Sequence, residues 1–307
     1  YIGKNVAKRL IYLGYNIICL VRPNNVKVPK SIKVYEIDIT DSQKMQEFNK
    51  KCPEFNVIIS CIGSRAGGIS DAWNVEYKAN DNLLKLGLKR KIDQYILLSA
   101  ICVQRPKCEF QYAKLAFEKT LMKSEVNHTI IRPTAFFKSL SGQVSKVKAG
   151  KNFIYFDNGS TTACKPISEA DLANFICECI NLKARLNKIL PVGGKGPAVT
   201  PLQMGNMLFE LINKKPKFFS IPSKLFLVGE KAISPLAYFS NKLKDTQQFL
   251  RIANYYATES MLVYNEKTNV YDEMLTPEYG QDTLKTHYKK LLFSDSIDDE
   301  LGDHKLF

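Results

Sequence analysis

The chain has 307 residues, of which 45% are hydrophobic and 24% charged, and its formal net charge is +14. This composition is typical of a globular protein with a large core, and no apolar run approaches the ~18–20 residues of a membrane-spanning helix. Because the lysines are dispersed along predicted helices and no nucleic-acid-binding motif is present, we expect no nucleic-acid partner. A phosphorylated cofactor, an acidic substrate or an anionic membrane surface would each suit the positive charge.

The eight cysteines form no Cys-x-x-Cys pair, and the chain contains only three histidines. We therefore expect no metal site. Cys177 and Cys179 fall on different faces of a predicted helix. Most of the thiols are expected to be small buried hydrophobic groups in a reducing compartment.

Apolar strands alternate with amphipathic helices through the first half of the chain. The pattern predicts a helix over 3–14 closed by Gly14, strands over 16–22, 34–40 and 56–63, a helix over 71–91, a strand over 94–100, a helix over 109–125 and a strand over 128–133. In the first helix Val6, Leu10 and Leu13 mark the inward face. Continuous apolar strands separated by helices predict a doubly wound α/β fold, in which helices cover both faces of a parallel sheet.

The pattern loosens after residue 150. We expect a short strand over 152–156, a helix capped by Ser168, a strand over 188–194 and a helix with Thr200 as N-cap and Pro201 in its first position. Residues 217–307 contain helical pieces rich in proline and aromatic residues. We therefore predict a Rossmann-like dinucleotide-binding domain over 1–150, and residues 151–307 that complete the fold and form a mainly helical substrate lobe.

Several candidate cofactor residues fall at the carboxyl ends of predicted strands, where ligands bind in an open α/β sheet. Gly3 begins a helix, as the last glycine of a phosphate-binding turn does, so we expect a strand and two earlier glycines before Tyr1. Arg22 ends the next strand and would pair with a 2′-phosphate, which favours NADPH; the alternative is a surface arginine. Asp38 would contact adenine, or simply cap a turn.

Two further strand ends carry small polar residues. Segment 61–68 contains Gly63 and Ser64, and its glycines would let the backbone approach a cofactor, although any glycine-rich turn would look the same. Ser99 follows the strand over 94–100 at a position where reductases often keep a hydroxyl; the alternative is an ordinary serine at a strand end.

The helix over 109–125 carries Lys114, which would hold the nicotinamide ribose unless it is an exposed helix lysine. Short-chain dehydrogenases place their acid tyrosine four residues before this lysine, where the present chain has Phe110. Tyr112 lies about 200° around the helix from Phe110 and cannot replace that tyrosine. We expect Phe110 to pack against nicotinamide or substrate, which disfavours routine ketone reduction but leaves hydride transfer to the cofactor.

Arg132 and Pro133 end the strand over 128–133 and are further cofactor-binding candidates, because they open the loop that presents substrate-side residues. Phe136 and Phe137 lie in this loop and are the candidates for substrate contact. Most other aromatic side chains in the second half of the chain are expected to pack in the core.

Several stretches resemble the divinyl chlorophyllide a 8-vinyl reductase family of atypical short-chain dehydrogenases. They are GSRAGGISDAWNVEYKANDNLL, LLSAICVQRPKCEFQYAKLAFE, IIRPTAFFKSLSGQV, ACKPISEADLA, LPVGGKGPAVTPLQMGNMLF, YYATESMLV, TPEYGQDTL and ELGDHKLF. Stretches such as ACKPISEADLA and YYATESMLV lie outside the generic cofactor fold and therefore speak for this family. Residues 217–251 resemble it less.

The resemblance implies that NADPH supplies a hydride to reduce the 8-vinyl group of a divinyl (proto)chlorophyllide to ethyl. It also implies a plastid location, with a transit peptide that is not in this sequence, and it is compatible with peripheral association with a plastid membrane. Two alternatives stay open. One is a non-catalytic NADPH-binding sensor or assembly factor, and the other is a reductase of an isoflavonoid or quinone type.

Overall fold

The computed structural model describes residues 1–23, 32–64, 68–238 and 240–293. Residues 65–67 of the glycine-rich segment and the carboxy-terminal stretch ELGDHKLF lie outside the described residues. The chain forms two compact units, one of residues 1–132 with 173–190 and one of 133–172 with 191–307. The functional division expected at residue 150 stays a prediction.

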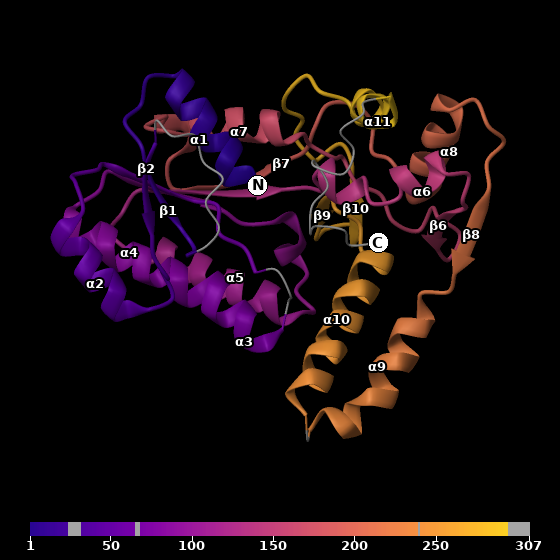
Figure 1. The fold of residues 1–307 in the computed structure, drawn as a ribbon, viewed down its shortest axis with the longest axis horizontal. Helices are drawn as coiled ribbons and strands as arrows, with labels where there is room; N and C mark the ends of the chain where they lie inside the picture. The colour runs from indigo at the N-terminus through magenta and orange to yellow at the C-terminus, as the bar shows by residue number, and fades with distance from the viewer. Residues whose placement is uncertain (24–31, 65–67, 239, 294–307) are drawn as a thin grey trace. The chain divides into compact units, whose positions relative to one another are not determined.

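The first unit is built on parallel strands with helices on both faces (Figure 1). Its elements are α1 (Ile2–Tyr12), β1 (Ile18–Val21), β2 (Lys33–Glu36), α2 (Ser42–Lys51), β3 (Val57–Ser60), α3 (Ile69–Ala72), η1 (Trp73–Lys78), α4 (Ala79–Arg90), β4 (Gln94–Leu98), η2 (Ile101–Gln104), α5 (Glu109–Met122) and β5 (His128–Pro133), followed after residue 168 by α7 (Glu169–Glu178), η4 (Lys183–Arg185) and β7 (Lys188–Val192). Strand β1 pairs with β2, and β3, β4, β5 and β7 form a second ladder. The pairs β1–β2, β3–β4 and β4–β5 are parallel.

Strand β4 directs apolar side chains alternately to the two faces of the sheet, so both faces must be covered. Tyr95 and Leu97 pack with Phe117 of α5 in a cluster that also contains side chains of α2 and α4. Ile96 points to the other face and is fully buried, as is Ile131 of β5. Figure 1 shows α2, α4 and α5 on one face and α1 and α7 on the other. The predicted doubly wound fold is confirmed.

Helix α1 begins and ends close to its predicted bounds. Gly14 adopts the left-handed conformation with φ +81°, which closes the helix as predicted. Val6 and Leu10 are buried, but the inward position predicted for Leu13 is wrong, because this side chain is 44% exposed. Leu13 is the C-cap residue, where the chain already leaves the helix.

The helix predicted over 71–91 is present but contains a feature that the sequence did not reveal. Between α3 and α4 the backbone forms the π-helical segment η1, which spans Trp73–Lys78. Wider turns of this kind change the direction of the side chains they carry and are frequent at functional sites. This segment carries the buried Glu76.

The second unit contains most of the remaining elements. They are η3 (Lys138–Leu140), α6 (Val144–Lys148), β6 (Phe153–Phe156), α8 (Pro201–Leu211), β8 (Phe218–Ile221), α9 (Lys224–Ala237), α10 (Asn241–Thr258), β9 (Val263–Asn265), β10 (Val270–Asp272) and α11 (Leu284–Phe293). Thr200 caps α8 as predicted, and the Ser168 hydroxyl accepts a hydrogen bond from the Asp171 amide at the start of α7. Residues 218–221 lie in the region expected to contain helical pieces, but they form a strand that pairs with β6 in parallel.

Several stretches that resemble the reductase family are packed tightly together in this second unit. A Cβ atom on Gly194 would lie 1.9 Å from the carbonyl oxygen of Pro166, so these backbones touch. The Asp171 carboxylate accepts hydrogen bonds from the amides of Gln281 and Asp282, at 3.1 and 3.0 Å. The shared features outside the cofactor domain therefore have a structural role.

No helix within the described part of the chain is long and apolar enough to cross a membrane. The eight thiols are free, and six of them are buried, as predicted. Burial raises the pKa of Cys164 to about 12. Such a group is unreactive near neutral pH, because the thiolate is the nucleophile.

Candidate active site

Arg22 and Asp38 follow neighbouring parallel strands. Val21 pairs with Glu36, so both side chains lie beyond the carboxyl ends of β1 and β2. Asp38 accepts hydrogen bonds from the Thr40 amide at 3.0 Å and its hydroxyl at 2.7 Å. These bonds, with a smaller contribution from Arg22, lower the pKa of Asp38. The turn cap considered for Asp38 is therefore present, and Arg22 is exposed and available to a ligand.

Gly3 lies in the first turn of α1, beside the end of β3. A Cβ atom placed on it would lie 3.4 Å from Cys61 Cβ, which is an ordinary contact. Helix α1 therefore lies close to Cys61, but the space beside Gly3 would also accept a small side chain at this position. The amino end of α1 thus lies beside the carboxyl end of β3, and the amide groups at such a helix end favour an anion.

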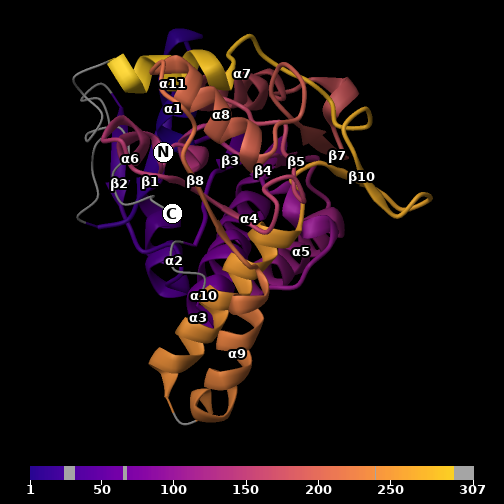
Figure 2. The same ribbon diagram turned by 90° about the vertical axis from the view of Figure 1, so that its right-hand side faces the viewer.

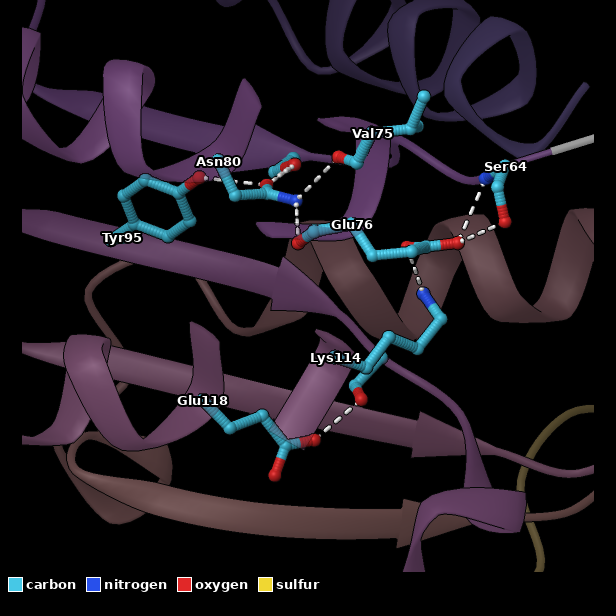
Figure 3. A network of polar contacts seen from close by, with 9 residues as sticks. Ser64, Val75, Glu76, Asn80, Tyr95, Lys114 and Glu118 are labelled. Atoms are coloured by element: carbon cyan, nitrogen blue, oxygen red, sulfur yellow. Dashed lines mark hydrogen bonds and ion pairs between the residues drawn. The ribbon is translucent and has the colours of Figure 1, made fainter. Parts of the chain in front are cut away.

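Lys114 on α5 is joined to the end of β3 by a buried carboxylate (Figure 3). Its Nζ lies 2.7 Å from Glu76 Oε2, and the exposed fractions of the two side chains are 13% and 3%. The other carboxylate oxygen, Oε1, accepts hydrogen bonds from the Ser64 amide at 2.8 Å and the Ser64 hydroxyl at 2.9 Å. Glu76 therefore joins Lys114 to Ser64 of the glycine-rich segment in one hydrogen-bonded network.

Glu76 itself is held by a second set of buried polar groups. The Asn80 amide donates to the Glu76 carbonyl at 2.9 Å, and Asn80 Oδ1 accepts from Ser60 at 2.5 Å and from Tyr95 at 3.1 Å. Figure 3 shows these groups continuing toward Lys114. Fully bonded buried networks of this kind are rigid.

Sequence reasoning missed Glu76. The available signal was its position among Ala72, Ala79 and Leu83, which have the spacing of an inward helix face and are all buried. An acid at such a position requires a partner, because a buried charge is costly unless it is paired. The partner, Lys114, could not be identified without the fold.

Ser99, Glu118 and Arg132 form a second cluster in the same unit. The Ser99 hydroxyl donates to Glu118 Oε1 at 2.5 Å, and Arg132 Nε donates to the same oxygen at 3.2 Å, while Arg132 Nη2 contacts Oε2. Glu118 is fully buried. Arg132 is thus engaged with a carboxylate, and its expected contact with a cofactor stays a prediction. Glu118 partners this arginine, although it lies one helical turn from Lys114.

A small recess lies beside both clusters, and in this structure it is too narrow to hold a water molecule. It is lined by Glu76, Asn80, Leu97, Leu98, Ser99, Lys114 and Phe117. Charged and hydroxyl groups therefore meet apolar side chains at the carboxyl end of β4, which is where substrates bind on this class of sheet.

The position of Tyr112 agrees with the helical spacing. Its side chain is 45% exposed, and its hydroxyl donates to the Pro106 carbonyl at 3.0 Å, away from Lys114. Phe110 is half-buried. The site therefore has a lysine without a tyrosine at the usual spacing.

The remaining candidates belong to the second unit. Pro133 is its first residue. Phe137 is 1% exposed, and its ring centroid lies 5.3 Å from that of His287, so it packs in the core. Phe136 is half-buried and bridges to Ile167. Of the two substrate candidates, Phe136 is therefore the more accessible.

Comparison with known proteins agrees with this geometry. The profile of a family described as NAD(P)H-binding matches residues 1–183. The chloroplastic divinyl chlorophyllide a 8-vinyl-reductase of Cucumis sativus is 40% identical over all of this chain and 77% of its own length. The chain belongs to the divinyl chlorophyllide a 8-vinyl-reductase family. The Arabidopsis thaliana reductase is 38% identical over 99% of the chain and 77% of its own length.

Two weaker similarities concern other proteins. The photosystem II assembly factor Ycf39 of Synechocystis is 21% identical over 63% of this chain and 59% of its own length. The NADPH complex of the Escherichia coli quinone oxidoreductase QOR2 superposes with a TM-score of 0.66, covering 94% of this chain and 96% of that one at 14% identity. At that identity the match shows the shared fold. A member of this reductase family is an oxidoreductase that binds a nicotinamide cofactor.

Proposed function

We propose that this protein reduces the 8-vinyl group of a divinyl chlorophyllide to an ethyl group, with NADPH as the reductant. The observation that carries this proposal is the identity of 37–40% to four reductases of that name over essentially the whole chain. The similarity includes the second half, beyond the part that matches the NAD(P)H-binding profile. All four relatives are chloroplastic, so we also propose a plastid location.

The residues on the strand ends suit a dinucleotide. The amino end of α1 at Gly3 would receive the diphosphate, and Asp38 would approach the adenine. Arg22 is an exposed cation at the end of β1 and would pair with a 2′-phosphate, which is the support for NADPH over NADH. Ser64 and Lys114, joined through Glu76, would hold the nicotinamide half, with Lys114 directed to the ribose.

When bound, the cofactor supplies a hydride, and a proton must reach the other vinyl carbon. The charge of Lys114 is balanced by Glu76 at 2.7 Å, so the lysine would bind and orient the cofactor beside the recess and would add little net positive charge there. Because the negative charge that develops on the macrocycle is spread over a conjugated ring, immediate protonation by a tyrosine is dispensable. Water or a side chain of the second half would deliver the proton. Phe110 would contribute shape and exclude water from the side of the substrate that receives the hydride, and Ser99 would line the recess.

The substrate itself is flat and apolar and carries a carboxylate. Phe136 would contact the ring, and Phe137 would support the loop from the core. Arg132 and Pro133 would shape the entrance to that loop. We also propose that the protein associates peripherally with a plastid membrane, as its charge of +14 allows.

The decisive experiment incubates the full-length protein with NADPH and divinyl chlorophyllide and follows the Soret band. A blue shift with consumption of NADPH is expected, and monovinyl chlorophyllide should give neither change. NADPH binding without turnover would instead favour a non-catalytic sensor or assembly factor. Two observations favour that second candidate function: the weak similarity to Ycf39, and the presence of Phe110 where short-chain dehydrogenases have their acid tyrosine. Turnover of a quinone or an isoflavonoid in place of the pigment would favour the remaining alternative.

A further inference from the structure

Helices α9 and α10 form an antiparallel hairpin in the second unit, and both views show them side by side (Figures 1 and 2). Arg251 of α10 donates from Nε to Glu230 of α9 at 2.5 Å. At the start of α9, Phe226 packs its ring against Phe156, with centroids 5.1 Å apart. The hairpin is thus anchored by one side of α9.

The opposite side of α9 is apolar although it faces solvent. The side chains of Leu225, Leu227 and Val228 are 57%, 42% and 63% exposed. A helix on a protein surface normally presents polar groups to water, and clustered exposed apolar side chains mark a binding surface. In α10, Phe249 is also 52% exposed.

The charged side chains on the exposed side of α9 are all positive. Lys224 and Lys231 are exposed, and helical spacing places both on the same side of α9 as Leu225, Leu227 and Val228. The only acid in the α9 sequence is Glu230, and it is turned toward Arg251. Exposed apolar side chains accompanied by lysines, without an acid among them, suit a helix that lies in the interface of an anionic membrane.

We infer that the exposed side of α9 docks on an anionic lipid surface. Leu225, Leu227 and Val228 would enter the boundary between headgroups and acyl chains, and Lys224 and Lys231 would contact acidic headgroups. The net charge of +14 adds long-range attraction to such a surface. The helix lies on the membrane and does not cross it, in agreement with the hydropathy of the described helices.

This docking specifies where the proposed peripheral association occurs, and its test does not use turnover. The full-length protein is sedimented with vesicles of phosphatidylcholine, with or without phosphatidylglycerol. Binding should require phosphatidylglycerol. Leu225→Gln with Val228→Gln should weaken binding about tenfold or more, and Lys224→Gln with Lys231→Gln should weaken it about fivefold per lysine.

Matched controls lie outside the hairpin in the same unit. Met274 is 90% exposed and Lys267 is also exposed, so Met274→Gln and Lys267→Gln change the same properties elsewhere. The controls should bind vesicles as the unaltered protein does, and all variants should keep the circular dichroism spectrum of the unaltered protein.

Three results would overturn the inference. The first is equal binding by the hairpin variants and the controls. The second is binding that ignores phosphatidylglycerol. The third is a soluble dimer that the apolar substitutions dissociate while vesicle binding persists, because the face would then be an interface between two copies of the chain.

Discussion

Lys114 and Glu76 depend on each other because both are largely removed from water. Their separation of 2.7 Å and the second oxygen's bonds to Ser64 satisfy the carboxylate on both sides. Removing one partner of a buried ion pair leaves the other uncompensated, at a cost of about 3–5 kcal/mol. The lysine predicted from the sequence is therefore one half of a buried ion pair.

Removing either partner of this pair should lower the turnover rate. Lys114→Ala is expected to lower kcat severely, and Glu76→Gln to lower it by about ten- to a hundredfold, since the amide keeps a hydrogen bond but loses the charge. Tyr112→Phe is the control, because that hydroxyl is bonded to the Pro106 carbonyl. Steady-state kinetics and circular dichroism would separate lost chemistry from lost folding. Greater damage from Tyr112→Phe would mean that the helix has been read in the wrong register.

Phe110→Tyr should leave vinyl reduction unimproved. The new hydroxyl would be half-buried, and without a partner it would cost about 1–3 kcal/mol. If the charge on the macrocycle does not need an adjacent acid, kcat measured against pH should keep the same profile. A large gain in kcat would show that proton delivery at this position limits the enzyme, contrary to the role proposed for Phe110.

Arg22→Ala should weaken NADPH binding selectively. Loss of one charge-assisted bidentate contact is expected to cost about 1.5–3 kcal/mol, whereas NADH lacks the 2′-phosphate and should bind as before. Titration of protein fluorescence with each cofactor measures both constants. Equal weakening for NADH and NADPH, or none for either, would remove Arg22 from the 2′-phosphate site.

Among the helices and strands, the sequence correctly predicted those features that depend on neighbouring residues in the chain. Thr200 with Pro201, and Ser168, identified helix starts because caps are local hydrogen bonds. The parallel strand β8 was missed because its four residues acquire their partner, β6, from far along the chain. The π-helical segment η1 was also invisible, since its side chains keep an ordinary helical pattern.

The contact between Gly194 and Pro166 joins the loop after β7 to the loop that precedes α7. Gly194→Ala would place a methyl group 1.9 Å from a backbone oxygen, and backbone cannot rotate away as a side chain can. We expect a loss of about 3 kcal/mol in the free energy of unfolding. Gly229→Ala is the matched control, because its methyl group would meet Leu250 at 3.4 Å within a helix and should be neutral or stabilising. Urea unfolding of both variants gives the comparison, and equal midpoints would contradict the close packing of this loop.

For the whole molecule, the alternation of apolar strands and helices was sufficient to predict the fold class, because a sheet buried on both faces allows few topologies. The sequence predicted that the candidate site residues lie at strand ends, but it did not predict which side chains they bond to. Ser99 and Arg132 were identified as separate candidates, yet both bond to Glu118. Pairings across the fold require knowledge of which helix faces which strand.

The positive charge of the whole chain should make it sensitive to acid. Hydrogen bonds from Thr40, Ser223 and Lys165 hold the pKa values of Asp38, Asp157 and Glu278 below their usual range. A carboxyl group whose pKa is lowered by folding stabilises the native state above its unfolded pKa of about 4, and this contribution is lost as the pH falls through its folded pKa. Protonation also raises the net charge above +14, which increases repulsion.

We therefore expect the urea midpoint to fall steadily as the pH is lowered below about 5, and to recover partly when salt screens the repulsion. Substituting Asp38, Asp157 and Glu278 by their amides should lower the midpoint at neutral pH and flatten its dependence on pH. Cys164 should stay unreactive toward thiol reagents until unfolding exposes it, which provides an independent probe of the same transition. A midpoint that is constant or rises in acid would show that these carboxylates and the excess positive charge do not govern the stability of the fold.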